Sequence, residues 1–200
     1  MEDDFPTPDD PLAAKPRKRK GPRKATAKSL ENAALHYLER FATSRENLRR
    51  VLMRRVERSV RHHGTDRDEG ARFIDDIIAK LEGLGLLDDR AYSEMRVRGL
   101  RRRGQSSRAV RASLMQKGVD SATIDDTLDT EEDDEGTGDP ELTAAITLAR
   151  KRRLGPYRPE EARKDNREKD LATLARAGFS YDMALRVVDA ETVEDLEPEF

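Results

Sequence analysis

The stretch GLGLLDDRAYSEMRVRGLRRRGQSSRAVRASLMQKGV, Gly83–Val119, decides the fold of this chain. Two carboxylates, Asp88 and Asp89, stand at an expected helix start, where a carboxylate can accept hydrogen bonds from the free backbone amides and where negative charge complements the helix dipole. Gly104 interrupts this helix, and the serines that follow it can cap a second one, which ends at Gly118. The stretch therefore predicts a pair of helices joined by a tight turn.

The two helices of this hairpin divide their residues into an apolar side and a basic side. We expect Tyr92 and Met95 of the first helix, and Leu114 of the second, to face inward and hold the pair together. Between Met95 and Val119 the chain has eight basic residues and no acidic one. We expect these residues to face outward and to form a surface for a polyanion or an acidic protein: Arg96, Arg98, Arg101, Arg102, Arg103, Arg108, Arg111 and Lys117.

The composition narrows the class of protein. Of the 200 residues, 40% are charged, 35% are hydrophobic, and only 4% are aromatic. Such a chain favours thin helical layers over one thick core, and the fold class we expect is all-α. The absence of cysteine excludes disulfides and thiolate chemistry. No apolar run reaches the length of a membrane span, and the acidic N-terminus does not resemble a secretory signal, so a cytoplasmic protein is expected.

Helical periodicity recurs three times along the chain. Aligning LMQKGVDSATIDDTL with LARAGFSYDMALRVV places Gly118 opposite Gly178 and Leu114 opposite Leu174, which indicates an internal repeat of about 50 residues. We predict three tandem three-helix repeats in a solenoid-like array. Their ranges and flanking segments are a disordered basic tail at 1–26, repeats at 27–84, 85–129 and 141–190, an acidic linker at 130–140 and an acidic tail at 191–200.

Two charged segments outside the repeats leave alternatives open. The sequence KPRKRKGPRK at 15–24 suits either an arm that contacts nucleic-acid phosphates or a solubilising tail. The acidic segment at 130–140 is a solvated linker, or else it folds back onto the arginines of the second repeat and competes with an anionic ligand.

No catalytic or cofactor motif is present. The three histidines, His36, His62 and His63, lack the partners that a metal site needs, and neighbouring carboxylates lie at helix starts or on exposed faces. We therefore expect no enzyme, no metal and no cofactor. The helix expected after Ser44 adds further outward arginines, among them Arg49, Arg50 and Arg54, for which a merely solvated face is an equal alternative.

The quoted stretch resembles the hallmark region of the RecX regulatory proteins, and ALHYLERFATSRENLRRVLMRR at Ala34–Arg55 is similar to the opening of that family. The resemblance covers residues 27–129 well. It implies a curved stack of three-helix repeats in the groove of the RecA–single-stranded DNA filament. Such a protein restrains filament growth, ATP hydrolysis, strand exchange and coprotease activity in recombination, DNA repair and the SOS response.

The resemblance also implies which residues make contact: Arg96, Arg101, Arg102, Arg103, Arg108 and Arg111. We expect a monomer, and we expect charge reversal at Arg101–Arg103 to abolish filament inhibition without loss of helix. The alternative is a DNA-binding protein that acts without RecA, for instance a helix-turn-helix regulator. Because the outward residues are nearly all arginine, contacts to the phosphate backbone are favoured over base readout.

Overall fold

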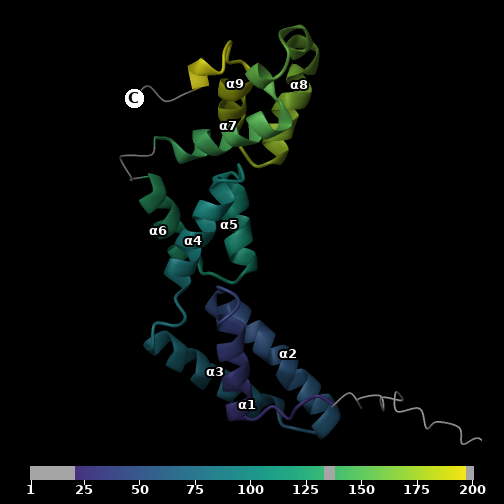
Figure 1. Ribbon diagram of the computed structural model, residues 1–200, viewed down its shortest axis with the longest axis vertical. Coiled ribbons are helices and arrows are strands. Elements are labelled where there is room, and N and C mark those ends of the chain that lie inside the picture. Colours follow the sequence, from purple (N-terminus) through teal and green to yellow (C-terminus); the bar gives the residue numbers. More distant parts are fainter. Residues whose placement is uncertain (1–20, 133–137, 197–200) are drawn as a thin grey trace, which may run out of the picture.

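The computed structural model describes residues 21–132 and 138–196, and within these ranges the regular structure is entirely helical (Figure 1). The all-α fold and its division into three units of three helices are confirmed. The first unit contains α1 (Ala27–Leu38), α2 (Arg45–His63) and α3 (Arg67–Gly83); the second contains α4 (Asp89–Arg101), α5 (Ser107–Gln116) and α6 (Ser121–Glu132); the third contains α7 (Pro140–Arg152), α8 (Glu160–Arg176) and α9 (Tyr181–Val188), with short 3-10 turns at Gly155–Tyr157 and Glu194–Leu196.

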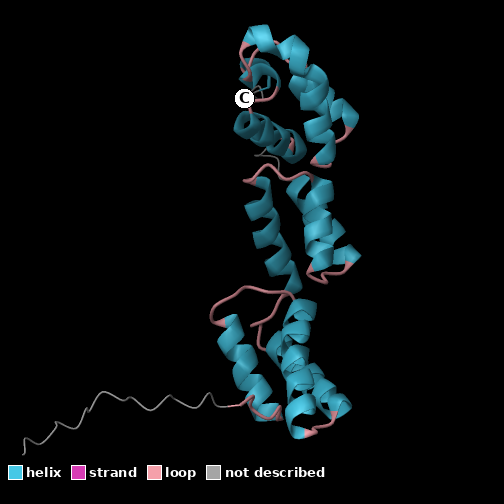
Figure 2. Cartoon of the chain, turned by 90° about the vertical axis from the view of Figure 1, so that its right-hand side faces the viewer, coloured by secondary structure: helices cyan, strands magenta, loops and turns pink. Residues whose placement is uncertain are grey.

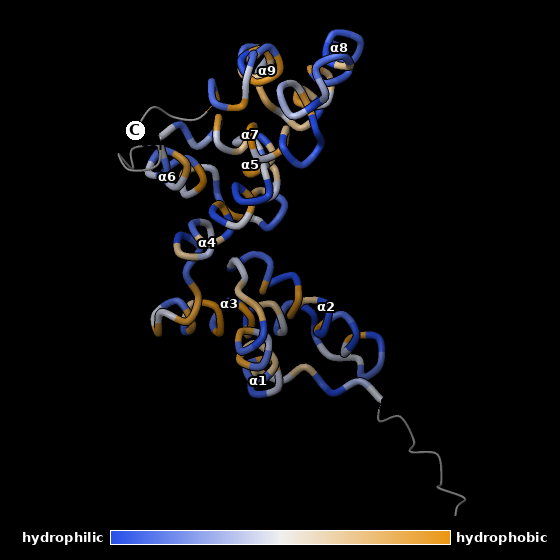
Figure 3. The backbone as a smooth tube through the Cα atoms, turned by 45° about the horizontal axis from the view of Figure 1, so that its top comes forward, coloured by the Kyte–Doolittle hydropathy of each residue, from blue (hydrophilic) through white to orange (hydrophobic). Residues whose placement is uncertain are grey.

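Each unit has a hydrophobic core of its own. The first core is built around Leu52 and Ile74, the second around Leu114 and Ile124, and the third around Leu174, and all five side chains are fully buried. Figure 3 shows the consequence for single helices, since hydrophobic residues form one side of α3 whereas α2 is largely hydrophilic. The units are therefore separate packing units, and the joints between them are largely polar.

The units stack in a row, and their second helices form a column along one edge (Figures 1 and 2). Ser44 is the N-cap of α2, and its hydroxyl donates to the backbone carbonyl of Lys117 at the end of α5. Ser106 caps α5 in the same way, and its hydroxyl donates to the carbonyl of Ala177 at the end of α8, at 2.7 Å. The negative end of one helix dipole thus meets the positive end of the next.

A carboxylate completes each of these joints. The first backbone amide of α2, that of Arg45, donates to Asp89 Oδ1 at 2.7 Å, and Asp89 is the first residue of α4. The first amide of α5, that of Ser107, donates to Glu141 Oε2 at 2.8 Å, and Glu141 lies in the first turn of α7. The two joints are therefore built alike, with a serine hydroxyl and an acidic side chain at the same places. Pro159, the N-cap of α8, has no hydroxyl with which to continue the series.

Glycine permits the close approach at both joints. Gly118 and Gly178 follow the second helices with φ of +79° and +96°. A Cβ at Gly118 would lie 2.4 Å from Glu46 Cγ, and one at Gly178 would lie 2.6 Å from Ser106 Oγ. Any other residue at these positions meets both backbone strain and a clash with the neighbouring unit.

The ends of the chain correct three of the expected boundaries. Residues 21–26, expected within the disordered tail, lie against α2, where the Ala25 amide donates to Ser59 Oγ at 2.9 Å. The acidic C-terminal segment supplies Leu196, which is only 3% exposed, to the third core. The expected linker at 130–140 is shorter, since α6 continues to Glu132 and α7 begins at Pro140. Residues 1–20, 133–137 and 197–200 lie outside the described residues.

Candidate polyanion interface

In the first two units, the column edge is rich in basic residues and α6 on the opposite edge is acidic. Along the column edge, α2 carries seven arginines against two glutamates, and α5 carries two arginines and no acidic residue. On the opposite edge in Figure 1, α6 carries five acidic residues and no basic one. A polyanion is therefore attracted to the edge that α2 and α5 form, and repelled from the edge that contains α6.

Of the eleven basic residues expected at the interface, seven have no ion pair among the described residues. They are Arg54 on α2, Arg96 and Arg98 on α4, Arg102 and Arg103 in the turn after α4, Arg108 on α5, and Lys117 directly after α5. Arg98 and Arg102 are exposed and four residues apart, so they share one face. These seven residues are defined here as the free cations. An anionic partner can contact them without first displacing a carboxylate.

Three of the remaining four are paired at the surface. Arg49 Nη1 lies 2.7 Å from Asp75 Oδ1 on α3, and Arg111 pairs with Asp125 on α6. Arg50 Nε donates to Glu46 at 3.1 Å, and its Nη1 donates to the carbonyl of Gln116 at 2.8 Å. Arg50 therefore stabilises the end of α5 across the first joint, a structural task that its sequence position does not reveal.

The expectation that Arg101 faces outward is wrong. Its side chain is 8% exposed, and it lies at the second joint between Glu131 of α6, at 3.0 Å, and Glu141 of α7, at 2.6 Å. It also donates to Ser107 Oγ at 2.7 Å. Burial by itself would lower the pKa of Arg101, but the hydrogen bonds to Glu141 and Glu131 outweigh it, and the net effect raises the pKa. Arg101 is a structural residue here, so the triple charge reversal at Arg101–Arg103 would damage the fold as well as the surface.

The structure also separates the residues expected to hold the hairpin together. Tyr92 and Leu114 are buried in the core of the second unit, and Asp88 Oδ1 accepts from the amides of Arg90 and Ala91 at the start of α4. Met95 was expected inward but is 43% exposed. The reason is helical phase, because the buried side of α4 passes through Tyr92, Ser93, Val97, Leu100 and Arg101.

The comparisons with known proteins concern the family and the fold. A family model described as "RecX, second three-helix domain" matches residues 88–128, which are α4 to α6 almost completely. The regulatory protein RecX of Myxococcus xanthus is 43% identical over 186 residues, which are 90% of this chain and 95% of that protein. The chain belongs to the RecX family.

Further RecX proteins extend the comparison. The regulatory protein RecX of Agrobacterium fabrum is 31% identical over 166 residues, covering 83% of this chain and 84% of that one. The crystal structure of RecX from Lactobacillus salivarius is similar in fold, with a TM-score of 0.58 and 22% identity over 82% of this chain and 96% of that one. A second crystal structure of a regulatory protein RecX has a TM-score of 0.56 and 24% identity over 82% of this chain and 72% of that one. The RecX relatives are named as regulatory proteins, and their similarity spans all three units.

The described residues of the RecX chain offer no candidate metal site and no candidate membrane-spanning helix. In residues 21–132 and 138–196, no three metal-ligating side chains gather into a group, and none of the helices described has the length and apolarity to cross a membrane. The joint residues Ser44, Ser106 and Glu141 were missed as a set by sequence reasoning. The sequence does contain a signal for the two serines, because Ser44 and Ser106 each lie directly before the second helix of their repeat.

Proposed function

We propose that this protein binds the filament that RecA forms on single-stranded DNA and restrains RecA activity without being an enzyme itself. The proposal covers filament growth, ATP hydrolysis, strand exchange and coprotease function, and hence recombination, DNA repair and the SOS response. Membership of the RecX family supports the general role. The observation that carries the interface is the set of seven free cations on α2, α4 and α5 and in the turns directly after α4 and α5.

Three of these free cations, Arg54, Arg108 and Lys117, lie along a column of helices that suits a long anionic partner. The column of α2 and α5 contains 29 helical residues, which at ~1.5 Å per residue extend for about 40 Å. Arginine presents several donors in a fixed plane and can bind two oxygens of a phosphate or carboxylate at once. Contacts of this kind hold a backbone without reading its sequence, as a regulator of a filament on arbitrary DNA requires.

The test is the single-stranded-DNA-dependent ATP hydrolysis of RecA from the same organism, with this protein titrated in at fixed moderate salt. The informative variant is Arg102→Glu/Arg103→Glu, because both side chains are exposed and neither belongs to the network around Arg101. The matched control is Lys164→Glu/Lys169→Glu on α8, which makes the same change of charge at two exposed residues of a charge-balanced helix. We expect the first variant to lose most of its inhibition and the control to keep it.

The alternative function makes a different prediction. A DNA-binding protein that acts without RecA would leave ATP hydrolysis unchanged when DNA is in excess, while it still shifts a labelled oligonucleotide in a binding assay. That outcome would overturn the RecA proposal and favour the alternative. Inhibition well below one protein per RecA monomer would indicate action at filament ends, and inhibition near equal amounts would indicate binding along the groove.

A further inference from the structure

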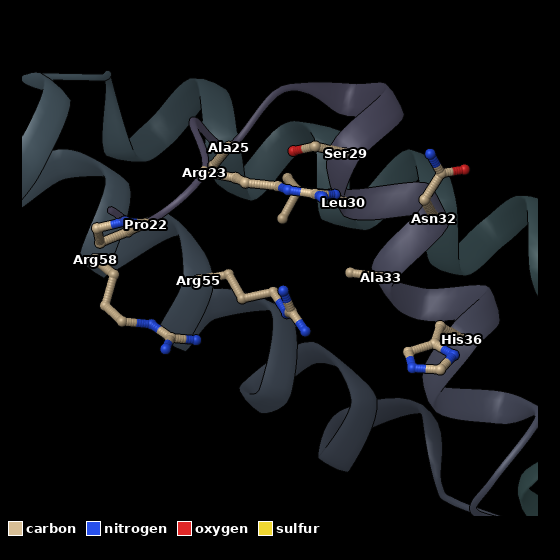
Figure 4. Close-up of a pocket in the computed structure, with 10 residues that line it drawn as sticks. All are labelled: Pro22, Arg23, Ala25, Ser29, Leu30, Asn32, Ala33, His36, Arg55 and Arg58. Carbon is tan, nitrogen blue, oxygen red and sulfur yellow. The ribbon is translucent and has the colours of Figure 1, made fainter. Parts of the chain in front are cut away.

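A hollow between α1 and α2 carries positive charge, and none of the seven free cations lines it. Figure 4 shows it: Arg55 reaches from α2 into the space between the helices, Arg23 comes from the chain that enters α1, and His36 lies farther along α1. The hollow has a volume of about 480 Å³. This is within the usual range for sites that hold small molecules.

The walls of the hollow combine an apolar floor with a basic rim. The apolar lining residues are Pro22, Ala25, Leu30 and Ala33; the polar and basic ones are Arg23, Ser29, Asn32, His36, Arg55 and Arg58. Among the described residues that line it, none is acidic. Within the described part of the chain, none of the three arginines has an ion pair, and Arg58 is bonded only through Nε, to the carbonyl of Arg54 at 3.2 Å.

The wall that carries Arg23 is held in place by α2. The Ala25 amide donates to Ser59 Oγ, a fully buried hydroxyl that also accepts from Thr65 Oγ1 at 2.9 Å. On the other side of Arg23, the carbonyl of Pro22 accepts a hydrogen bond from His63 Nε2 at the end of α2, at 2.7 Å. Bonds on both sides of Arg23 fix its backbone beside the hollow, so its position does not depend on a free chain end.

Electrostatics indicates what this hollow can hold. Three like charges gathered around one space repel one another, and the described lining residues provide no carboxylate to reduce this repulsion. An anion that enters relieves this repulsion and offers oxygens to guanidinium groups, which bind phosphate oxygens well. The apolar floor can meanwhile cover a sugar or a base. A nucleotide combines these two parts.

We propose that the hollow between α1 and α2 is a binding site for one nucleotide, with its phosphate held by Arg23, Arg55 and Arg58. The nucleotide is either free or one unit of a single-stranded nucleic acid. The described lining residues include no aromatic side chain, so base stacking on them contributes little and the site tolerates all bases. The proposal does not need RecA, and its test contains none, so it can fail or succeed independently of the proposed function.

The experiment measures binding of the full chain to three probes by titration: a labelled oligothymidylate, thymidine triphosphate and inorganic pyrophosphate. The test variants are Arg55→Glu and, because it precedes α1 and cannot disturb a helix, Arg23→Glu. The control is Lys28→Glu, which makes the same change of charge at an exposed residue of α1 that does not line the hollow.

We expect each test variant to weaken binding of one nucleotide probe roughly tenfold or more, and the control to change it by less than about threefold. If the test variants lose binding of the oligonucleotide alone, the nucleotide is one unit of a nucleic-acid strand. If they lose binding of the triphosphate, the ligand is a free nucleotide. Binding of pyrophosphate as tight as that of the triphosphate would overturn the role of the apolar floor. Equal losses in the control and in both test variants would overturn the site itself, because the attraction would then be one of net charge alone.

Discussion

Removal of Arg101 tests whether the second joint is held by a buried ion network. Its guanidinium is 8% exposed and contacts Glu131 and Glu141, which are 21% and 23% exposed. Breaking a buried pair by removing one partner costs about 3–5 kcal/mol, because the other charge stays buried and unpaired. Glu141 keeps its bonds from the amide and the hydroxyl of Ser107, so the loss for Arg101→Ala is expected near the lower end, about 3 kcal/mol.

The assay is thermal and urea unfolding followed by circular dichroism. For a chain of this size, about 3 kcal/mol corresponds to a decrease in Tm of roughly 6–12 °C. The control is Arg102→Ala, the neighbouring exposed arginine, which should stay within about 0.5 kcal/mol of the parent. Neutralising the whole network in Arg101→Met/Glu131→Gln/Glu141→Gln should recover more than half of the loss, because no buried charge is then left unpaired. A loss below about 0.5 kcal/mol for Arg101→Ala, or no recovery in the triple variant, would refute the reasoning.

The remaining predictions concern the glycines and the carboxylate of the joints. Gly178→Ala should lower stability by more than about 1 kcal/mol, since φ is +96° and a Cβ would meet the N-cap hydroxyl of α5 at 2.6 Å. Gly99→Ala, in the open interior of α4, should instead raise stability by about 0.5–1 kcal/mol. Thermal unfolding distinguishes these two opposite changes. Burial raises the pKa of Asp89, against the opposing effect of its bond from the Arg45 amide. The Asp89 side chain therefore contributes fully to the stability of the folded state below the ordinary pKa of 3.8, and this contribution is lost as pH rises through the raised pKa. The free energy of unfolding of Asp89→Asn, taken relative to that of the parent, should accordingly be higher at pH 7 than at pH 3.5. Urea unfolding at both pH values measures this difference, and a lower relative stability at pH 7 would contradict the prediction.

Much of the architecture follows from the sequence alone. Apolar residues at three- and four-residue spacing bury one stripe of each helix, and Ser44, Asp88 and Ser106 satisfy amides within the next three residues. Such signals are local, because both the cause and the effect lie within one helical turn. The repeat can be predicted from the sequence for a related reason. Gly118 and Gly178 follow the second helix in two units, where the positive φ of the helix end favours glycine.

Only part of the candidate interface could be predicted from the sequence. The run from Arg96 to Lys117 contains no acidic residue, and this alone indicates a basic surface. It does not distinguish Arg101, whose carboxylate partners lie 30 and 40 residues farther along the chain, from Arg102, which is exposed. Nor does it reveal that Arg50 donates to the end of α5, 66 residues away.

The sequence by itself determined the helices, their caps, their threefold repetition and the excess of arginine in the second unit, because each depends on residues a few positions apart. Tertiary structure alone decided which arginines are free, since an ion pair depends on where distant carboxylates arrive in space. It also decided that Arg23, Arg55 and Arg58 surround one hollow, because the bond from the Ala25 amide to Ser59 joins residues 34 positions apart. Local propensity contains no information about such contacts, and they exist only once the units have packed.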